Sequence, residues 1–271
     1  MRSPLRRTWN VLAVFVVATW LFPVYWVVMT SLKADRDINT ATPKFVFDPT
    51  VNNYQEIFDR FQFGKVLINS FVIVSVATAI TITLALLAAY SLARMRLRGA
   101  NALALVILSF RFMPGVVVVL PYYLTFSELR LTDSYTGMVL VYVAFGLPFA
   151  VWLLRGFLLD LPQDIDEAAR LDGLGRLAIL RRIVLPLAAP GVAVTAIFTF
   201  VFNWNEYLFA LILTDARALT VPVQISKMID AYSVLWGNLS AAVVLQLIPM
   251  VIVVFLLQRH IVRGLALGAV K

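Results

Sequence analysis

The sequence lacks cysteine, contains a single histidine, and has charged side chains at only 14% of its 271 positions. Without cysteine, the chain cannot form disulfides, iron–sulfur clusters or cysteine-based zinc sites, and it cannot use thiol catalysis. Hydrophobic residues make up 61% of the chain and the mean hydropathy is +0.88, whereas ordinary soluble domains are roughly 45–50% apolar. This composition excludes a water-soluble enzyme as the default and favours a membrane protein with about six spanning helices.

Catalytic motifs are also missing. No Gly-x-x-x-x-Gly-Lys-Ser/Thr segment occurs, so the loop and lysine that hold nucleotide phosphates are not in this chain. The one histidine, His260, follows Arg259 near the end of the last apolar stretch, where a structural role is expected. An intramembrane enzyme would need a metal or nucleophile constellation, and the sequence offers neither. We therefore predict no enzyme activity, no metal site and no cofactor in this chain.

Six apolar stretches are each long enough to cross a bilayer as a helix. The first resembles a signal peptide, but its apolar run exceeds the ~7–15 residues of that class and no Ala-x-Ala site follows, which predicts an uncleaved anchor. The predicted fold class is an all-α integral membrane protein with one transmembrane domain over residues 1–271. The predicted spans are approximately 11–30, 69–93, 102–124, 138–157, 191–213 and 241–262.

The net charge of +8 is distributed unevenly over the connections. No dense Lys/Arg block is present, so we expect no nucleic-acid partner. The amino terminus, the second and fourth loops and the tail together hold fourteen of the 23 Lys and Arg residues. Because cytoplasmic loops retain an excess of basic residues, we predict that both termini are cytoplasmic.

The predicted cytoplasmic loop 158–190 has the pattern of two short helices. Acidic residues at 164–167 suit the positive end of a helix dipole, and Gly173 and Gly175 can end that helix. A second amphipathic helix follows, until Pro186 and Pro190 are expected to interrupt the run into the fifth span.

The same loop contains a signature with fixed spacing: Glu167-Ala168-Ala169, three residues, Gly173, nine residues, Ile183, one residue, Leu185-Pro186. This pattern resembles the cytoplasmic signature of permease subunits in binding-protein-dependent ABC importers. The resemblance implies the type I importer permease fold, with a coupling helix between Asp164 and Arg182 that docks on a separate ATPase subunit.

In that family Glu167 would pair with a basic group, Ala168 and Ala169 would allow close approach, and Gly173 would allow the turn. ATP and Mg²⁺ would bind only to the partner ATPase. The alternative is an interfacial amphipathic helix without a partner.

Further segments resemble the shorter carbohydrate permease of maltose-type systems. They are Asn69-Ser70, Arg111-Phe112-Met113-Pro114, Asn203 to Tyr207, Leu219 to Val223 and Gln258 to Gly264. The resemblance implies a sugar substrate and a plasma membrane location in a bacterium or archaeon. It also implies three kinds of partner: a second homologous permease, two ATP-binding subunits and an extracytoplasmic solute-binding protein. It does not identify the sugar.

Polar residues within the spans form a candidate translocation path. Arg111 and Glu206 each cost at least ~2.5 kcal/mol at a helix centre unless they face water or a partner. Amide groups can bond sugar hydroxyls, and aromatic rings can stack on sugar rings. The candidate residues are Asn203, Trp204, Asn205, Glu206, Tyr207, Arg111 and Asn69. The alternative is that these side chains join helices by hydrogen bonds. An ion pair between Arg111 and Glu206 is a further hypothesis.

Two other features complete the prediction. Pro114 and Gly115 should kink the third span. By the resemblance, the outer loop 214–240 should reach into the solute-binding protein, with contacts expected at Asp230, Ala231, Tyr232, Ser233 and Trp236. A solvated connector is the alternative for this loop. The rival function for the whole chain is a stand-alone secondary carrier or channel that uses Glu206 and Arg111, although no internal repeat supports it.

Overall fold

The computed structural model describes residues 4–95, 97–229 and 234–268. Helices dominate this part of the chain, and its only β pairing is one isolated bridge between Ile229 and Val234. Five helices are long and apolar enough to cross a membrane, or six if one sharply bent pair counts as a span. The all-α prediction is confirmed.

The chain divides into two compact units. Unit 1 comprises Met1–Lys65 and Gln224–Ile248, and unit 2 comprises Val66–Val223 and Pro249–Lys271. Helices α4 (Phe63–Arg94), α12 (Val221–Ser226) and α13 (Trp236–Gly268) contribute residues to both units. The single transmembrane domain over 1–271 stays a prediction.

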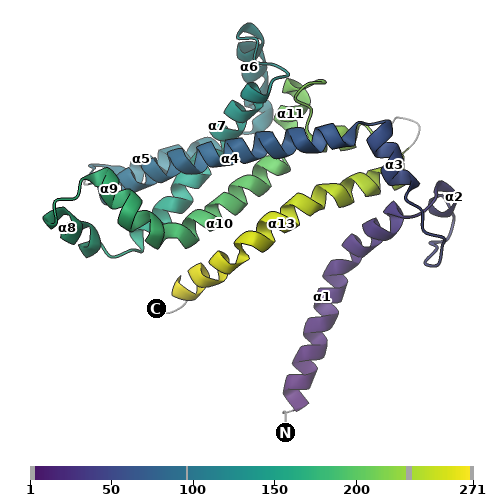
Figure 1. Cartoon of the computed structure of the whole chain (residues 1–271), viewed down its shortest axis with the longest axis horizontal. Helices are drawn as coiled ribbons and strands as arrows, with labels where there is room; N and C mark the ends of the chain where they lie inside the picture. The colour runs from purple at the N-terminus through teal and green to yellow at the C-terminus, as the bar shows by residue number, and fades with distance from the viewer. Residues whose placement is uncertain (1–3, 96, 230–233, 269–271) are drawn as a thin grey trace. The chain divides into compact units, whose positions relative to one another are not determined.

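Unit 1 contains α1 (Pro4–Ser31), α2 (Asp35–Ile38) and α3 (Asn52–Asp59) (Figure 1). The last carbonyls of a helix have no partner within it. Here the Asn53 amide supplies one, because its Nδ2 donates to the carbonyls of Ser31 (2.9 Å) and Lys33 (2.8 Å). At the start of α13, a Cβ on Gly237 would lie 2.5 Å from Asn53 Oδ1, so only glycine fits beside this cap.

The core of unit 2 lies between α4, α5 (Ala100–Ser109), α7 (Tyr135–Leu159) and α10 (Leu185–Trp204). Small residues, among them Ala85, Ala150 and Ala188, are buried in one cluster with Leu154 and Leu158. Small side chains let helix backbones approach closely where the bilayer supplies little hydrophobic driving force. The predicted second and fourth spans correspond to α4 and α7, which the structure extends at both ends.

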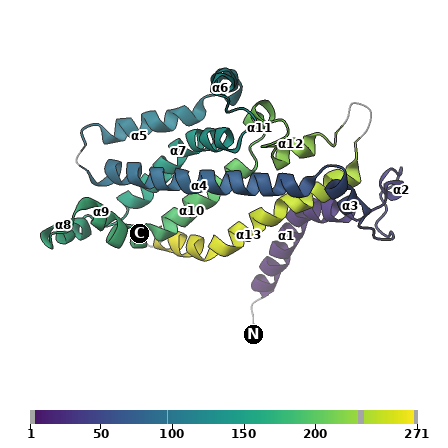
Figure 2. The same ribbon diagram turned by 45° about the horizontal axis from the view of Figure 1, so that its top comes forward.

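The third span is broken rather than continuous. Helix α5 and a 3₁₀ turn at Phe110–Phe112 are followed by α6 (Gly115–Glu128), and the two parts are bent by 86° (Figure 2). Met113 is extended, with φ −63° and ψ 127°, because the proline that follows disfavours the helical conformation. The kink predicted at Pro114 and Gly115 is confirmed, and it divides the predicted span 102–124 into two helices.

The fifth span differs from the predicted 191–213 at both ends. One helical stretch runs from Arg176 to Trp204 through α9 (Arg176–Ile179), a π-helical turn (Leu180–Val184) and α10. The interruption predicted at Pro186 and Pro190 is wrong: the chain widens into the π turn just before Pro186, which occupies the first turn of α10 where proline is tolerated. The actual break lies at 205–207, before α11 (Leu208–Leu213).

The segment 214–221 links α11 to α12, and side chains from elsewhere in unit 2 hold its backbone. The Asp133 carboxylate accepts hydrogen bonds from the N–H groups of residues 215, 216, 217 and 218 at 2.9–3.2 Å. Burial alone raises the pKa of Asp133, but these four backbone donors outweigh it and lower the pKa from 3.8 to about 2. The segment is therefore clamped by an ionised carboxylate.

Candidate functional site

The loop that carries the signature begins with α8 (Asp164–Leu171), whose first turn holds Asp164, Asp166 and Glu167. Anionic side chains at this end interact favourably with the helix dipole, as the sequence predicts. In Figure 1, α8 and α9 lie together at the carboxyl-terminal end of α4. The two short helices predicted for residues 158–190 are therefore present, with the second one continuing directly into α10.

Gly173 ends α8 with a left-handed conformation, φ +81°. The N–H of Leu174 donates to the Ala169 carbonyl at 3.0 Å, and the N–H of Gly173 donates to the Arg170 carbonyl at 3.0 Å. This pair of bonds defines a Schellman motif, in which the left-handed position costs any residue with a Cβ roughly 1–2 kcal/mol. The turn predicted at Gly173 is confirmed, and the hydrogen bonds give the physical reason for glycine six residues after Glu167.

One face of the loop is open to a partner, and we call it the docking face: Glu167, Ala168, Leu171 and Leu177. All four residues are exposed, and the two leucines are 90% and 70% exposed. Large apolar side chains that stand out beside charged residues are typical of protein interfaces. The docking face is therefore not covered by any described part of the chain.

The remaining signature residues face inward or lie at the base of the loop. Ala169 is 3% exposed and belongs to the core cluster of unit 2, against which Ile183 packs. Leu185 is half-buried and Pro186 is exposed at the start of α10. Of the two alanines, only Ala168 offers surface for a close approach. The ATPase-coupling role of the seven signature residues stays a prediction.

A buried ion pair joins the loop to α4. Arg94 Nε lies 3.2 Å from Asp166 Oδ2, and the two side chains are 3% and 5% exposed. Arg94 Nη2 also donates to the Leu161 carbonyl at 3.0 Å, and the Tyr90 hydroxyl reaches Asp166 Oδ1 at 3.4 Å. Sequence reasoning used Arg94 only for topology and Asp166 only for the helix dipole. No local pattern connects two residues so far apart in the sequence.

A pocket of about 400 Å³ opens beside this ion pair. Its lining is mostly polar, with three arginines and two acidic residues, and it includes Glu167 from the docking face. The lining residues are Arg94, Met95, Gln163, Asp166, Glu167, Arg170 and Arg176.

A second cavity, of about 220 Å³, lies among α7, α10 and the broken third span, and we call it the polar cavity. Arg111, Asn203 and Glu206 line it together, as predicted for the translocation path. Thr199 and several aromatic side chains complete the lining and were missed by sequence reasoning. The aromatic residues are Tyr142, Phe145, Phe149, Phe202 and Phe209.

Glu206 acts as a cap for α11. Its Oε1 accepts from the N–H of Phe209 at 2.8 Å, and its Oε2 accepts from the N–H of Ala210 at 3.1 Å. Arg111 instead lies over the ring of Phe202, with 5.3 Å between Cζ and the ring centroid. The Arg111–Glu206 ion pair is not formed among the described residues, because the carboxylate is already engaged by backbone donors. That hypothesis is wrong for this structure.

The other residues of the predicted path lie outside the lining of the polar cavity. Trp204 is 1% exposed and its ring stacks on Phe200, with 5.6 Å between centroids and 12° between planes. Asn205 is exposed and donates to the Val201 carbonyl at 2.8 Å. Tyr207 is 40% exposed. Their part in transport stays a prediction.

Asn69 is 1% exposed and supports the clamped segment instead. Its Nδ2 donates to the carbonyls of Arg217 (3.0 Å) and Leu219 (3.1 Å), and its Oδ1 accepts from the Tyr135 hydroxyl. Its neighbour Ser70 accepts from the N–H of Val221 at 2.8 Å. The Asn69-Ser70 pair that marks the family resemblance thus fixes the backbone that precedes α12.

The predicted contacts with a solute-binding protein fall mainly on residues that the structure does not describe. Asp230, Ala231, Tyr232 and Ser233 lie outside the described residues. Trp236 opens α13 and is 50% exposed.

Apolar helices, a polar cavity among them and an exposed helical loop are typical of a membrane permease. A model of the binding-protein-dependent transport system inner membrane component family matches residues 81–267, a range that includes the signature loop and the polar cavity. The chain belongs to this family.

Curated relatives resemble the chain over nearly its whole length. The trehalose/maltose transport system permease MalG of Thermococcus litoralis is 34% identical over 263 residues, which cover 96% of this chain and 94% of that protein. The trehalose transport system permease SugB of Mycobacterium tuberculosis is 35% identical, with 97% of both chains covered. The diacetylchitobiose uptake permease DasC of Streptomyces coelicolor is 33% identical, with 100% and 99% covered.

A solved structure shares the fold. A chain of a bacterial ABC transporter that imports the acidic polysaccharide alginate matches with a TM-score of 0.75 at 20% identity, covering 96% of this chain and 99% of that one. The helical arrangement is therefore that of a chain of this transporter.

Proposed function

We propose that this chain is a transmembrane subunit of an ATP-driven sugar importer. The proposal rests on the docking face of the signature loop. A single helical stretch joins this face to the polar cavity, and it runs from Arg176 to Trp204. The names of the relatives support a carbohydrate substrate, because the three described above transport trehalose, maltose or diacetylchitobiose.

The helical stretch supplies a mechanical route between the two sites. Its first residue, Arg176, lines the pocket beside the docking face, and near its other end Thr199 and Asn203 line the polar cavity. A helix transmits displacement along its axis as a rigid body. When separate ATPase subunits close on ATP and Mg²⁺, they move the docking face, and α10 carries that movement to the cavity. Transport then proceeds by alternating access.

The partner ATPase engages the loop by charge and by apolar contact. Glu167 pairs with a basic group of the ATPase, while Leu171 and Leu177 fill an apolar cleft. The pocket beside Glu167, which is lined by three arginines and two acidic residues, binds a polar group of the same partner. On this proposal the signature loop and both termini lie in the cytoplasm, as the distribution of basic residues predicts.

The polar cavity forms part of a sugar path shared with a second homologous permease. Arg111, Asn203 and Thr199 offer hydrogen-bonding groups for hydroxyls, and Phe149 and Phe202 offer flat apolar surface. An extracytoplasmic solute-binding protein delivers the sugar on the opposite face. A solved relative supports this partner, because that alginate transporter was crystallised with a periplasmic protein bound to an alginate pentasaccharide.

Reversing the charge of Glu167 tests the proposal. Glu167→Lys in the assembled importer should abolish sugar uptake, either by releasing the ATPase subunits or by uncoupling their ATP hydrolysis. The control is Glu128→Lys, which makes the same change at an exposed residue at the end of α6 and should transport normally. Normal uptake and normal assembly of the Glu167→Lys importer would contradict the proposal.

The stand-alone carrier predicts a different result on reconstitution. If Glu206 and Arg111 served ion coupling, this chain alone in vesicles would accumulate substrate along an ion gradient. Membership of the binding-protein-dependent family opposes this function. We expect transport only when the second permease, the ATPases and the binding protein are present.

A further inference from the structure

Unit 1 contains a buried cation that no function described above uses. Lys33 follows the end of α1 and is 3% exposed. Its Nζ lies 4.8 Å from the centroid of the Trp26 ring and 5.1 Å from that of the Phe47 ring. Buried lysines are rare unless an anion accompanies them. Among the described residues, no carboxylate lies within 4.0 Å of this ammonium group. Its charge is therefore not paired with an anion of the described chain.

The ammonium group lines an open pocket of about 350 Å³, which we call the α1 pocket. The lining residues, all from unit 1, are Trp26, Thr30, Lys33, Asp37, Ile38, Asn39, Thr40, Ala41, Pro43, Lys44 and Trp236. This volume lies within the range of small-molecule sites, roughly 300–1,000 Å³.

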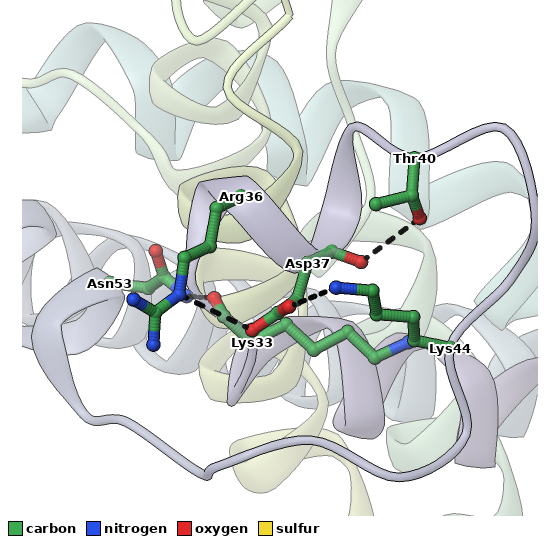
Figure 3. Close-up of polar contacts among 6 residues, drawn as sticks. All are labelled: Lys33, Arg36, Asp37, Thr40, Lys44 and Asn53. Atoms are coloured by element: carbon green, nitrogen blue, oxygen red, sulfur yellow. Dashed lines mark hydrogen bonds and ion pairs between the residues drawn. The ribbon is translucent and has the colours of Figure 1, made fainter.

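The one carboxylate in the lining already has partners. Lys44 Nζ lies 2.7 Å from Asp37 Oδ1, and Arg36 Nε lies 3.8 Å from Asp37 Oδ2 (Figure 3). The hydrogen bond from Lys44, followed by the charges of the neighbouring cations, lowers the pKa of Asp37. With two ammonium groups and one ionised carboxylate in the lining, the pocket has a net positive charge. Lys33 is the cation in it that Asp37 does not neutralise.

The position of the pocket indicates where an anion would come from. Trp26 and Thr30 belong to the last turns of α1, a helix long and apolar enough to cross a membrane, whose most apolar stretch has no buried residue. Tryptophan and lysine at the end of such a helix lie at the level of the lipid headgroups. The α1 pocket therefore opens at the depth where lipid phosphates are concentrated.

The hydroxyl groups of the pocket favour one kind of headgroup. Thr30 Oγ1 donates to the Trp26 carbonyl at 2.9 Å, and Thr40 Oγ1 donates to the Thr42 carbonyl at 2.9 Å. Both hydroxyl oxygens are thus left as acceptors, which suits a headgroup that carries hydroxyl donors of its own. A choline headgroup has none and would place a second cation near Lys33 and Lys44.

We propose that the α1 pocket binds the headgroup of an anionic phospholipid, with a phosphate oxygen on Lys33 Nζ and the headgroup hydroxyls on Thr30 and Thr40. Phosphatidylglycerol has both features. The site is separate from the docking face and from the polar cavity, and it does not depend on the proposed transport function.

Native mass spectrometry of the full importer tests the proposal, with phosphatidylglycerol and phosphatidylcholine offered in equal amounts. The wild type should retain phosphatidylglycerol preferentially. Lys33→Gln should reduce that retention about fivefold, because one cation near the surface contributes ~1 kcal/mol to the binding of anionic lipid. Lys33→Arg should restore it. The matched control is Lys65→Gln, which removes an exposed lysine of unit 1 outside the pocket and should retain the lipid like the wild type.

Three outcomes would overturn the proposal. The first is equal retention of both lipids by the wild type, a result that needs no variant and therefore holds even if Lys33→Gln fails to fold. The second is unchanged retention in Lys33→Gln. The third is displacement of the lipid by millimolar glycerol phosphate, which would identify a soluble phosphate as the ligand of Lys33.

Discussion

The loop 158–190 and the segment 214–221 both connect longer elements of unit 2, but they are held in opposite ways. The loop is fixed to α4 by one buried side-chain ion pair, Arg94–Asp166, and leaves the docking face exposed. The segment is fixed by Asp133, Asn69 and Ser70, whose side chains bond its backbone directly. The loop therefore has a free face that a partner can use, whereas the backbone N–H groups of the segment at residues 215–218 are bonded within the chain.

The largest effect should come from breaking the ion pair. Arg94→Ala leaves the buried Asp166 carboxylate without its cation, and removing one member of a buried pair costs about 3–5 kcal/mol. We expect loss of folded protein in the membrane, measured by fluorescence-detected gel filtration. The double variant Arg94→Met, Asp166→Leu should recover folded protein, since apolar replacement of both members avoids the unpaired charge. Failure of the double variant together with normal folding of Arg94→Ala would mean that the pair does not anchor the loop.

A smaller effect should follow from Gly173→Ala, because the left-handed conformation at φ +81° costs a residue with a Cβ about 1–2 kcal/mol. The substitution should lower both the thermal midpoint and the ATP-dependent uptake. Gly156→Ala is the matched control: Gly156 lies within α7, where an added Cβ meets nothing within 4 Å and alanine favours the helix. If the two variants behaved alike, the turn at Gly173 would not require glycine.

An effect similar in size to that of Gly173→Ala should come from the clamp of segment 214–221. Asp133→Asn replaces one acceptor oxygen by a donor that faces backbone N–H groups, which should cost about 1–3 kcal/mol. Asp215→Asn is the control, because the side chain of Asp215 is exposed and only its N–H takes part in the clamp. Thermal unfolding in detergent measures both variants. Equal midpoints for the two would show that the ionised carboxylate of Asp133 is not needed.

The same clamp predicts a pH dependence. The pKa of Asp133 is lowered in the folded chain from 3.8 to about 2, so its stabilising effect is complete above about pH 4 and is lost as the pH falls toward 2. The difference in thermal midpoint between the wild type and Asp133→Asn should therefore shrink over this range. A difference that stays constant from pH 5 to pH 2 would contradict the lowered pKa.

Sequence patterns predicted the features that depend on neighbouring residues. Hydropathy located the apolar helices, Pro114 marked the bend, and Gly173 marked the end of α8, because each of these depends on a few adjacent positions. The same reasoning set the ends of the fifth span wrongly. It missed the π turn before Pro186 and the break at 205–207, because the average hydropathy of a window does not report a local change of backbone geometry.

Contacts between distant parts of the chain were beyond such patterns. Nothing near Asp166 indicates Arg94 as its partner, and nothing near Asp133 indicates the backbone at 215–218. Glu206 is the intermediate case. A carboxylate three residues before Phe209 has the spacing of a helix cap, a local signal that could have predicted its hydrogen bonds. The ion pair with Arg111 was a hypothesis based only on opposite charge and overlapping depth in the membrane.

The most direct test of the docking face uses the absence of cysteine from the sequence, which makes a single introduced cysteine unique in this chain. Leu171→Cys changes a side chain that is 90% exposed, so stability should change by less than about 0.5 kcal/mol. In the assembled importer, a thiol-reactive crosslinker at position 171 should join this chain to the ATPase subunit. The yield of crosslinked product should fall once nucleotide binding changes the position of the loop. Labelling of the cysteine by a membrane-impermeant reagent from outside intact cells, without any crosslink to the ATPase, would contradict the account.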